Sequence, residues 1–423
     1  MKYRILIVAD GPHIPTGYGQ QNYLLTKRFT ELGHEVICFD TSYPMDDMKG
    51  GIYNIKQFLD EYFDKQKNHY HPFINIGEDI KTACICFKRT DTAHPYEDIA
   101  YYIRKTQPDI FIILKDLNNY INSRFAIPSI CYVPIDSFPV SPDITSKLHN
   151  FDKVITISEY GKKQLKNYNA DFISHSINHS IVRQVMKKDK NELKKKYGIP
   201  TDKFIVGIIA SNTESNNRKN WDFNISSFKE FNIKYPNSFL FINTLMSGKS
   251  NNHLIKHHKS GLDLNYYMDL INLSNDRWST IPNKMYRKYN TEQIYEQYRC
   301  FDVLLSCSAG EGCSVCLLEA QALGTAVITT DYTAMTENCL NGELVEPYFL
   351  SYRQTDSFFA IPKKEQIIEK LEKIYNNPDC YIKNQVVDFI NKKTNYKING
   401  DKWIKLIDEV ITNYKIKKNL QSS

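Results

Sequence analysis

Short apolar runs alternate with amphipathic segments along this chain, and the alternation occurs in two successive series. The first series has apolar runs at 3–9, 35–39, 82–87, 109–114, 129–133 and 153–157, and the second at 204–210, 239–243, 302–306 and 326–329. Runs without a polar face are typical of parallel strands that helices cover on both sides. The sequence therefore predicts an α/β fold with two doubly wound, Rossmann-like domains.

We expect two domains in this chain of 423 residues, because a domain typically holds about 100–200 residues. The expected parts are a first domain at 1–175, a linker at 176–202, a second domain at 203–395 and a helix at 396–423 that packs back on the first domain. The linker contains the charged stretch KKDKNELKKKYGIP, which is typical of a solvated helix face. Residues 44–80 are irregular and predict no element.

Apolar residues at helical spacing predict three helices in the second half of the chain. Their buried faces would carry Trp221, Ile225, Phe228 and Phe231 in the first, Ile367, Ile368, Leu371 and Ile374 in the second, and Trp403, Leu406, Ile407, Val410 and Tyr414 in the last. The second helix should end at Asn377 and Pro378, because proline cannot continue a helix.

The net charge of +6 is mild for this length, whereas a nucleic-acid-binding protein usually shows a larger or more clustered basic excess. We therefore expect no nucleic-acid partner. The charge is compatible with anionic small molecules or with a weak peripheral contact to a membrane surface. No apolar stretch approaches the length of a membrane span, and ten cysteines scattered through the chain suit a reducing cytosol. These features favour a cytoplasmic location.

The segment SAGEGCSVCLLEAQALGTAVITTD holds the strongest signal for chemistry. It runs from a strand end through a Gly-Glu-Gly loop into a helix, a tight turn and another strand. Gly310 and Gly312 would let the backbone approach a ligand closely. The helix should begin near Ser314, where its free N–H groups suit a phosphate. Glu311 in the loop and Glu319 in the helix could grip two parts of one ligand; alternatively, both are surface glutamates.

Other patterns bear on metal and redox chemistry. Cys313 and Cys316 make a C-x-x-C spacing, but no second such pair exists, which favours packing residues over a metal or redox site. Three histidines lie close in sequence without the glutamate of an H-E-x-x-H motif, and we expect them at the surface: His253, His257 and His258. No D-x-D pair occurs to hold a metal-bound diphosphate. We therefore expect neither a metal nor a cofactor.

Taken together, these pieces resemble the sequence signature of glycosyltransferase family 4, whose members are retaining enzymes with the GT-B fold. The long segment is similar to the family's EGFGLPLLEAMACGxPVIxTD. In chain order, TGYGQQ resembles its glycine loop, GHEVICFD its second strand, DKVITISEYGKKQL its VITVSExxKxxL unit, FISHSINHSIV its IPHGVDxxxF stretch, and IVGIIASNTESNNRKNW its phosphate-binding strand and loop. The resemblance covers most of the chain except about residues 44–100 and implies a GT-B fold.

The resemblance implies roles for four matching residues. Glu311 would contact the donor sugar and Glu319 the nucleotide ribose. Arg218 and Lys219 would hold the pyrophosphate and neutralise the charge that builds on the leaving nucleoside diphosphate. Many members of the family separate these two cations, whereas here they are adjacent, and neighbouring side chains rarely point at the same atom. We therefore expect one of the two to face the ligand more directly.

Further positions are implied at the donor site and the face opposite it. Gly17 and Gly19 resemble glycines that approach the donor phosphates, although a Gly-x-Gly can simply form a turn. Asp136 would bind sugar or acceptor hydroxyls, or it starts an Asx turn before Phe138. His175 matches the family's histidine, although a lone histidine is more often structural. The donor would also contact the start of the helix, at Gly312, Cys313, Ser314 and Val315.

We therefore expect a retaining glycosyltransferase that moves a sugar from a nucleoside-diphosphate sugar to an acceptor hydroxyl. The resemblance implies that the domain at 203–395 binds the nucleotide sugar and that the acceptor enters from the side of the domain at 1–175. The acceptor could be a glycan, a lipid-linked saccharide or a protein. Two alternatives stay open: a sugar phosphorylase or nucleotide-sugar epimerase on the same fold, and a non-catalytic scaffold subunit that kept the fold.

Overall fold

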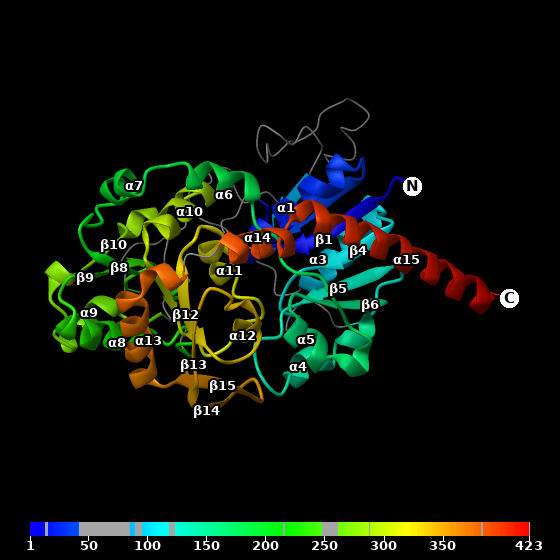
Figure 1. Ribbon diagram of the computed structural model, residues 1–423. Coiled ribbons are helices and arrows are strands. Elements are labelled where there is room, and N and C mark those ends of the chain that lie inside the picture. Colours follow the sequence, from blue (N-terminus) through cyan, green and yellow to red (C-terminus); the bar gives the residue numbers. More distant parts are fainter. Residues whose placement is uncertain are drawn as a thin grey trace. The chain divides into compact units, whose positions relative to one another are not determined.

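A computed structural model describes residues 1–12, 16–41, 85–88, 95–117, 123–214, 216–247, 261–286, 288–381 and 384–422. Residues 44–80 and the three histidines His253, His257 and His258 lie outside the described residues. The chain divides into two compact units (Figure 1). Unit 1 consists of Met1–Pro134, Val140–Ile177 and Thr394–Ser423, and unit 2 of Ile135–Pro139 and Asn178–Lys393.

Unit 1 is built on a parallel sheet with the strand order β3-β2-β1-β4-β5-β6-β7. Its strands are β1 (Arg4–Ala9), β2 (Glu35–Asp40), β3 (Ile85–Lys88), β4 (Ile110–Ile113), β5 (Ser129–Val133), β6 (Lys153–Thr156) and β7 (Asp171–Phe172). Strands β4 and β5 are buried at every position, which explains why their sequences show no polar alternation.

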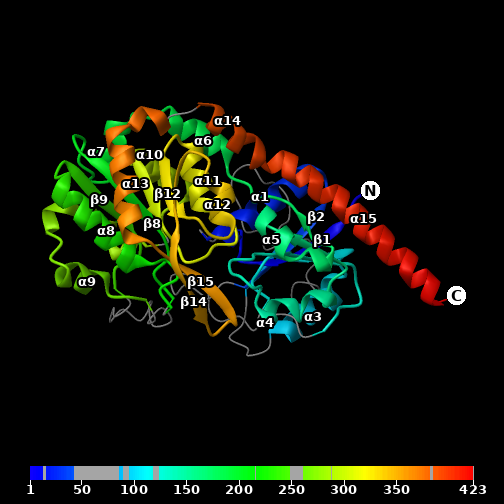
Figure 2. The same cartoon turned by 60° about the horizontal axis from the view of Figure 1, so that its bottom comes forward.

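The helices of unit 1 are α1 (Gly17–Glu31), α3 (Pro95–Thr106), α4 (Pro142–Thr145), α5 (Glu159–Gln164) and α15 (Tyr396–Ser422), with 3₁₀ turns at Leu148–Asn150 and Lys166–Tyr168. Helix α15 packs against α1 and extends beyond it at its C-terminal end, as Figure 2 shows. The fully buried Trp403 meets the ring of Tyr132 edge to face at 4.9 Å, and Arg28 of α1 forms an ion pair with Asp401. These contacts attach the end of the chain to unit 1.

Unit 2 is built on a parallel sheet with the strand order β10-β9-β8-β11-β12-β13, followed by an antiparallel hairpin of β14 and β15. The strands are β8 (Phe204–Ile209), β9 (Ser238–Asn243), β10 (Trp278–Thr280), β11 (Val303–Ser306), β12 (Ala326–Thr330), β13 (Gly342–Val345), β14 (Pro347–Arg353) and β15 (Ser357–Pro362). Strand order reverses between β8 and β11, as in doubly wound sheets generally.

The helices of unit 2 are α6 (His179–Met186), α7 (Lys190–Lys196), α8 (Trp221–Lys234), α9 (Leu264–Leu270), α10 (Thr291–Cys300), α11 (Val315–Ala322), α12 (Ala334–Asn338), α13 (Lys364–Asn376) and α14 (Asn384–Lys393), with 3₁₀ turns at Asn275–Arg277, Asn283–Met285 and Pro378–Tyr381.

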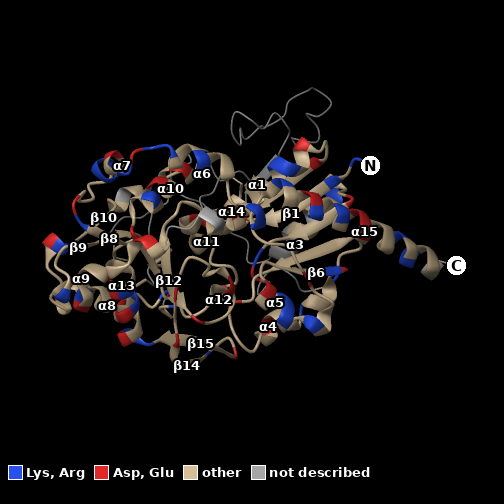
Figure 3. Ribbon diagram, viewed as in Figure 1, with Lys and Arg blue, Asp and Glu red and all other residues tan. Residues whose placement is uncertain are grey.

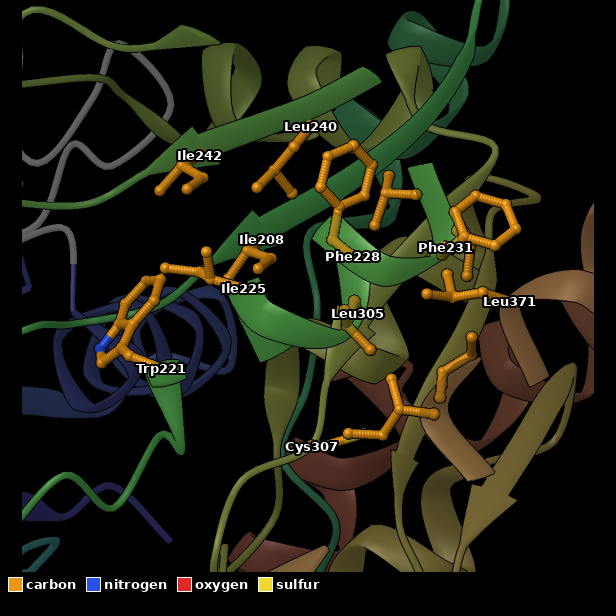
Figure 4. Close-up of a cluster of buried hydrophobic side chains, with 14 of the residues drawn as sticks. Ile208, Trp221, Ile225, Phe228, Phe231, Leu240, Ile242, Leu305, Cys307 and Leu371 are labelled. Atoms are coloured by element: carbon orange, nitrogen blue, oxygen red, sulfur yellow. The ribbon is translucent and has the colours of Figure 1, made fainter. Parts of the chain in front are cut away.

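The predicted buried face of helix α8 is confirmed. Its apolar residues pack in one cluster with Ile208, Leu240 and Ile242 of the sheet (Figure 4). This packing fixes the start of α8, which lies beside the candidate site.

The stretch 176–202 is more ordered than a linker. It contains α6 and α7, both of which belong to unit 2 and pack against α10. The side chain of Glu296 on α10 is 2% exposed. Its carboxylate oxygens form ion pairs with Lys188 Nζ and Lys196 Nζ, each at 2.5 Å. The sequence alone predicts that this charged stretch is solvated, because its partner Glu296 lies about a hundred positions away in the chain.

Basic and acidic residues are interspersed along the ribbons of both units in Figure 3. No helix in the described part of the chain combines the length and the apolar character that a bilayer span requires.

Candidate functional site

The candidate site of unit 2 lies where the strand order of its sheet reverses. Strands β8 and β11 are parallel neighbours, with Val303 paired to Val206 and Leu304 to Gly207. Their carboxyl ends therefore lie at the same edge, and ligands of open α/β sheets bind outside that edge. The loop after β8 carries Arg218, and the loop after β11 carries Glu311.

Arg218 and Lys219 both point at the same carboxylate. Arg218 Nη1 lies 3.1 Å from Glu311 Oε2, and Lys219 Nζ pairs with Glu311 Oε1. Asn217 and Asn220 on either side have positive φ angles of 50° and 47°, a conformation that asparagine tolerates better than most residues. This turn brings both neighbouring cations to one side, where both meet the Glu311 carboxylate, whereas we expected only one of them to face the site directly.

A second carboxylate orients the arginine. Glu214 accepts hydrogen bonds from Arg218 Nε at 2.9 Å and from Nη2 at 2.7 Å, and the carbonyl oxygen of Gly310 accepts one from Nη1 at 3.0 Å. Burial alone would lower the pKa of Arg218, but the charges of Glu311 and Glu214 raise it well above its usual value. Arg218 is therefore a fixed cation. Glu214 is not among the residues predicted from the sequence, although its i,i+4 spacing to Arg218 is visible there.

The carboxyl group of Glu311 is ionised at neutral pH, because its pKa is lowered. Burial would raise its pKa, but the charges of Lys219 and Arg218 lower it to about 2. Its backbone is also held, because Thr333 Oγ1 accepts from the amide of Glu311 at 3.1 Å and lies 3.0 Å from its carbonyl oxygen. Thr333 has a φ of 54°, which is strained for a β-branched residue. Strain of this kind clusters at functional sites.

Gly310 allows the segment Ile135–Pro139 to approach the loop after β11. A Cβ atom on Gly310 would lie 2.0 Å from the carbonyl oxygen of Asp136, so no other residue fits without a shift. The charge of Asp136 also contributes to raising the pKa of Arg218. Asp136 therefore lies in the same electrostatic environment as Arg218 and Glu311, within unit 2.

Helix α11 begins where the sequence predicts. Ser314 precedes it with a φ of 55° and no side-chain cap, which leaves backbone N–H groups at the helix start without a capping side chain. Cys313 is buried and Cys316 is half-buried, and burial raises the pKa of both thiols, that of Cys313 to about 12. Both cysteines are free thiols, consistent with packing rather than redox chemistry.

Glu319 lies farther into α11, in a different environment from Glu311. Burial raises the pKa of its carboxyl group to about 7, although hydrogen bonds from Tyr295 and Tyr298 oppose this shift. Both tyrosines are buried on α10. Neither tyrosine could be predicted from the sequence, because their contact with α11 depends on the packing of two helices. The pKa values of the two carboxyl groups are thus shifted in opposite directions, that of Glu311 downward and that of Glu319 upward to about 7.

Three candidate residues belong to unit 1. Gly17 and Gly19 form the first turn of α1, whose cap is the Thr16 hydroxyl, which accepts from Gly19 N at 3.1 Å. Among the residues that the structure describes, a Cβ on Gly17 would meet no atom within 4 Å, so their packing does not require a glycine there. His175 is 3% exposed, and neither ring nitrogen has a hydrogen-bond partner within the described chain. Burial lowers the pKa of His175 to about 3, so its imidazole is neutral.

The part of the chain that the structure describes contains no group of three or more His, Cys, Asp or Glu placed to hold a metal ion.

Part of the candidate site lies in a segment that matches a known protein family. Residues 276–377, which include Glu311 and Glu319, match the family model described as Glycosyl transferases group 1. The match covers less than half of the chain and does not include Arg218 or Lys219. No curated protein sequence shows significant similarity to this chain.

Solved structures resemble the chain over nearly its whole length. A glycosyltransferase from Rickettsia africae is 15% identical with a TM-score of 0.64, covering 97% of this chain and 99% of its own. HepE from Anabaena, solved with UDP-glucose, is 11% identical with a TM-score of 0.62, covering 97% and 100%. A putative UDP-N-acetylglucosamine 2-epimerase from Listeria monocytogenes is 12% identical with a TM-score of 0.55, covering 98% of each chain. The predicted fold class is thereby confirmed: this chain has the GT-B fold, with two doubly wound units.

Proposed function

We propose that this chain is a retaining glycosyltransferase that uses a nucleoside-diphosphate sugar as its donor. The observation that carries the proposal is the meeting of Arg218 and Lys219 at Glu311, beside the uncapped start of α11. Two fixed cations and a helix N-terminus are the elements that hold a diphosphate without further help. The match of residues 276–377 to a glycosyltransferase family model supports the same reading.

The cations would act on the leaving group. Their charge is balanced by the carboxylates of Glu311 and Glu214. A donor diphosphate placed at the same edge would share Arg218 and Lys219, and its growing negative charge would strengthen these contacts as the glycosidic bond breaks. Interactions that strengthen in the transition state accelerate the chemical step.

Glu311, ionised at all working pH values, would lie against the donor sugar and help stabilise the positive charge that develops at the anomeric carbon. Glu319 would accept hydrogen bonds from the ribose hydroxyls. We infer that the leaving phosphate takes the acceptor proton, so that the chain contributes positioning and electrostatics rather than a nucleophile. Asp136 would bind hydroxyl groups of the sugar or of the acceptor. Gly17, Gly19 and His175 stay candidate donor-binding residues of unit 1.

The proposal includes a metal-independent reaction in the cytoplasm, with at most a peripheral membrane contact and no nucleic-acid partner.

The direct test is calorimetric titration of the full chain with UDP, GDP and ADP, followed by a hydrolysis screen of the matching nucleotide sugars. We expect one nucleoside diphosphate to bind and its sugar to be released. A scaffold subunit would bind none of the three.

A nucleotide-sugar epimerase is the second candidate, because a protein named as one shares the fold. An epimerase changes the configuration of the donor sugar in the absence of an acceptor. Product analysis by NMR with donor alone distinguishes the two: a new epimer contradicts the transferase, whereas slow hydrolysis that speeds up when a hydroxyl acceptor is added supports it.

A further inference from the structure

The hairpin of β14 and β15 in unit 2 exposes an unusual number of aromatic and aliphatic side chains. The exposed fractions are 72% for Tyr348, 51% for Phe349, 44% for Leu350 and 62% for Tyr352. Strand β15 is buried at every position except Phe358, so the exposed apolar side chains of the hairpin belong mainly to β14. Large apolar side chains gathered at a surface mark binding sites more often than chance exposure does.

Strand register lines up three aromatic rings across this hairpin. Tyr352 pairs with Phe358 in the antiparallel ladder, and their rings lie 5.4 Å apart. On its other side Phe358 forms an antiparallel bridge with Phe138, whose side chain is 50% exposed. Directly paired residues share one face of a sheet, so Tyr352, Phe358 and Phe138 form an aromatic row. The two strands of the hairpin and the bridged residue Phe138 lie at the spacing of neighbouring strands, which makes this row about 10 Å across.

The aromatic row leads to the candidate site. Phe138 belongs to the segment Ile135–Pro139, which is part of unit 2, and Asp136 lies two residues before it. The Asp136 carbonyl is the group that approaches Gly310, and the Asp136 charge acts on Arg218. The row and the proposed diphosphate-binding cations are therefore joined through one short segment, Ile135–Pro139.

The charge of the hairpin favours a neutral ligand. Between residues 347 and 362 the only charged residues are Arg353 and Asp356, so their charges cancel. A surface that docks on anionic lipid would need several lysines or arginines beside its apolar residues. Aromatic rings stack on the C–H faces of sugar rings, and tyrosine hydroxyls can hydrogen-bond to sugar hydroxyls. The width of the row matches two linked pyranose rings.

We propose that the aromatic row binds a neutral saccharide and so serves as an acceptor subsite on unit 2. This inference rests on the proposed transferase function, because it assigns the acceptor of that same site. A saccharide stacked on Tyr352 and Phe358 would place its end toward Phe138 and Asp136, where a hydroxyl can reach the donor.

The test measures saccharide binding directly. The full chain is titrated, with saturation-transfer NMR as readout, with maltohexaose, cellohexaose, chitohexaose and a mannohexaose, with and without a saturating nucleoside diphosphate. We expect at least one to bind, and Tyr352→Ala to weaken its binding about fivefold or more, because an aromatic contact is lost. Tyr352→Phe should bind nearly as the wild type. Tyr266→Ala, which removes an equally exposed tyrosine from α9, should change nothing.

Several outcomes would overturn the aromatic row as a saccharide site. These are a wild-type chain that binds none of the four saccharides, and a Tyr352→Ala variant that binds them unchanged. Sedimentation with phosphatidylcholine vesicles or self-association that depends on Tyr352 would instead assign the row to a lipid or to a second copy. The proposed function is tested separately by nucleoside diphosphate binding, which Tyr352→Ala should leave unchanged. Saccharide binding without any nucleotide binding would contradict the transferase and leave the row in place.

Discussion

Arg218 Nη1 lies 3.1 Å from the Glu311 carboxylate, and this ion pair joins the loop after β8 to the loop after β11. The two loops meet at the point where ligands of such sheets bind. Since both side chains are mostly buried, the pair holds two opposite charges in a fixed position before any ligand arrives. Preorganised charges of this kind cost no rearrangement at the moment of reaction.

Replacing Arg218 or Lys219 by alanine should lower kcat by about a hundredfold, or ~3 kcal/mol, and raise the donor KM much less. Each cation should stabilise the leaving diphosphate more strongly in the transition state than in the bound donor. Because both side chains reach Glu311, we expect the two losses to be of similar size. Steady-state kinetics with the donor identified in the hydrolysis screen measures both constants.

Arg277→Ala is the matched control for this pair. Arg277 belongs to the same unit but pairs with its neighbour Asp276 at 3.2 Å, and we expect its removal to leave both constants unchanged. Wild-type turnover in both the Arg218 and Lys219 variants would mean that the diphosphate is held elsewhere. A large loss in one variant alone would restore the expectation made from sequence.

Nucleotide affinity should depend on the ionisation of Glu319. Burial raises the pKa of Glu319 to about 7, and only its ionised form is a pure acceptor for ribose hydroxyls. Affinity for the nucleoside diphosphate should therefore rise as the pH goes from 6 to 8, by about tenfold or less. Glu319→Gln should bind more weakly than the wild type at pH 8, and calorimetry across this range checks both expectations.

The phosphate of the nucleotide itself titrates near pH 6, and Glu319→Gln serves as the control for that contribution. If wild type and variant showed the same change of affinity with pH, the dependence would belong to the nucleotide alone and the ribose assignment of Glu319 would fail.

Periodic features could be predicted from sequence because they depend on local spacing. The apolar runs became strands β1, β8 and β11, and the 3.6-residue spacing of Trp221, Ile225, Phe228 and Phe231 became the buried face of α8. The start of α11 was also visible, since a Gly-Glu-Gly loop cannot continue a helix. The doubly wound fold follows from the order of these elements.

Features that depend on distant partners could not be predicted. The turn that directs both Arg218 and Lys219 to Glu311 depends on two asparagines with positive φ, and no spacing rule reports that. Tyr295 and Tyr298 come near Glu319 only through the packing of α10 on α11. The hairpin at 347–362 is rich in β-formers, yet its exposed face and its bridge to Phe138 became visible only in the fold.

Alanine substitutions at Gly310 and Gly17 distinguish a glycine that packing requires from one that a ligand requires. Gly310→Ala should destabilise the chain by about 1–3 kcal/mol and lower activity, because the new Cβ would overlap the Asp136 carbonyl. The Cβ of Gly17→Ala would meet no atom of the described residues within 4 Å, so this variant should leave the urea midpoint unchanged or slightly raised. A Gly17→Ala variant with normal stability but weaker donor binding would support its place beside the phosphates; normal binding would assign Gly17 to the turn alone.

Activity should survive a metal chelator. The chain has no D-x-D pair, and Arg218 and Lys219 can neutralise a diphosphate themselves. Turnover measured before and after dialysis against EDTA should agree. Loss of turnover that Mn²⁺ or Mg²⁺ restores would remove the metal-independent part of the proposal.

The ion pairs of Glu296 should contribute measurably to stability, in contrast to charges on the open surface. Glu296 is almost fully buried and accepts from Lys188, Lys196 and Tyr197, which attach α6 and α7 to α10. Glu296→Gln should lower the free energy of unfolding by about 2 kcal/mol, since hydrogen bonds to a charged group are lost without loss of volume. Urea unfolding followed by circular dichroism measures this difference.

Glu192 supplies the matched control, because it lies in the same charged stretch, pairs with Lys195 and is 71% exposed. Glu192→Gln should change stability by less than about 0.5 kcal/mol.

Burial would raise the pKa of Glu296, but hydrogen bonds from Lys188, Lys196 and Tyr197 lower it. A carboxyl group with a lowered pKa stabilises the fold above its unfolded pKa and loses that contribution as the pH falls through its folded pKa. The gap between wild type and Glu296→Gln should therefore close in acid, and a gap that stayed constant with pH would show that packing rather than charge holds α6 and α7 in place.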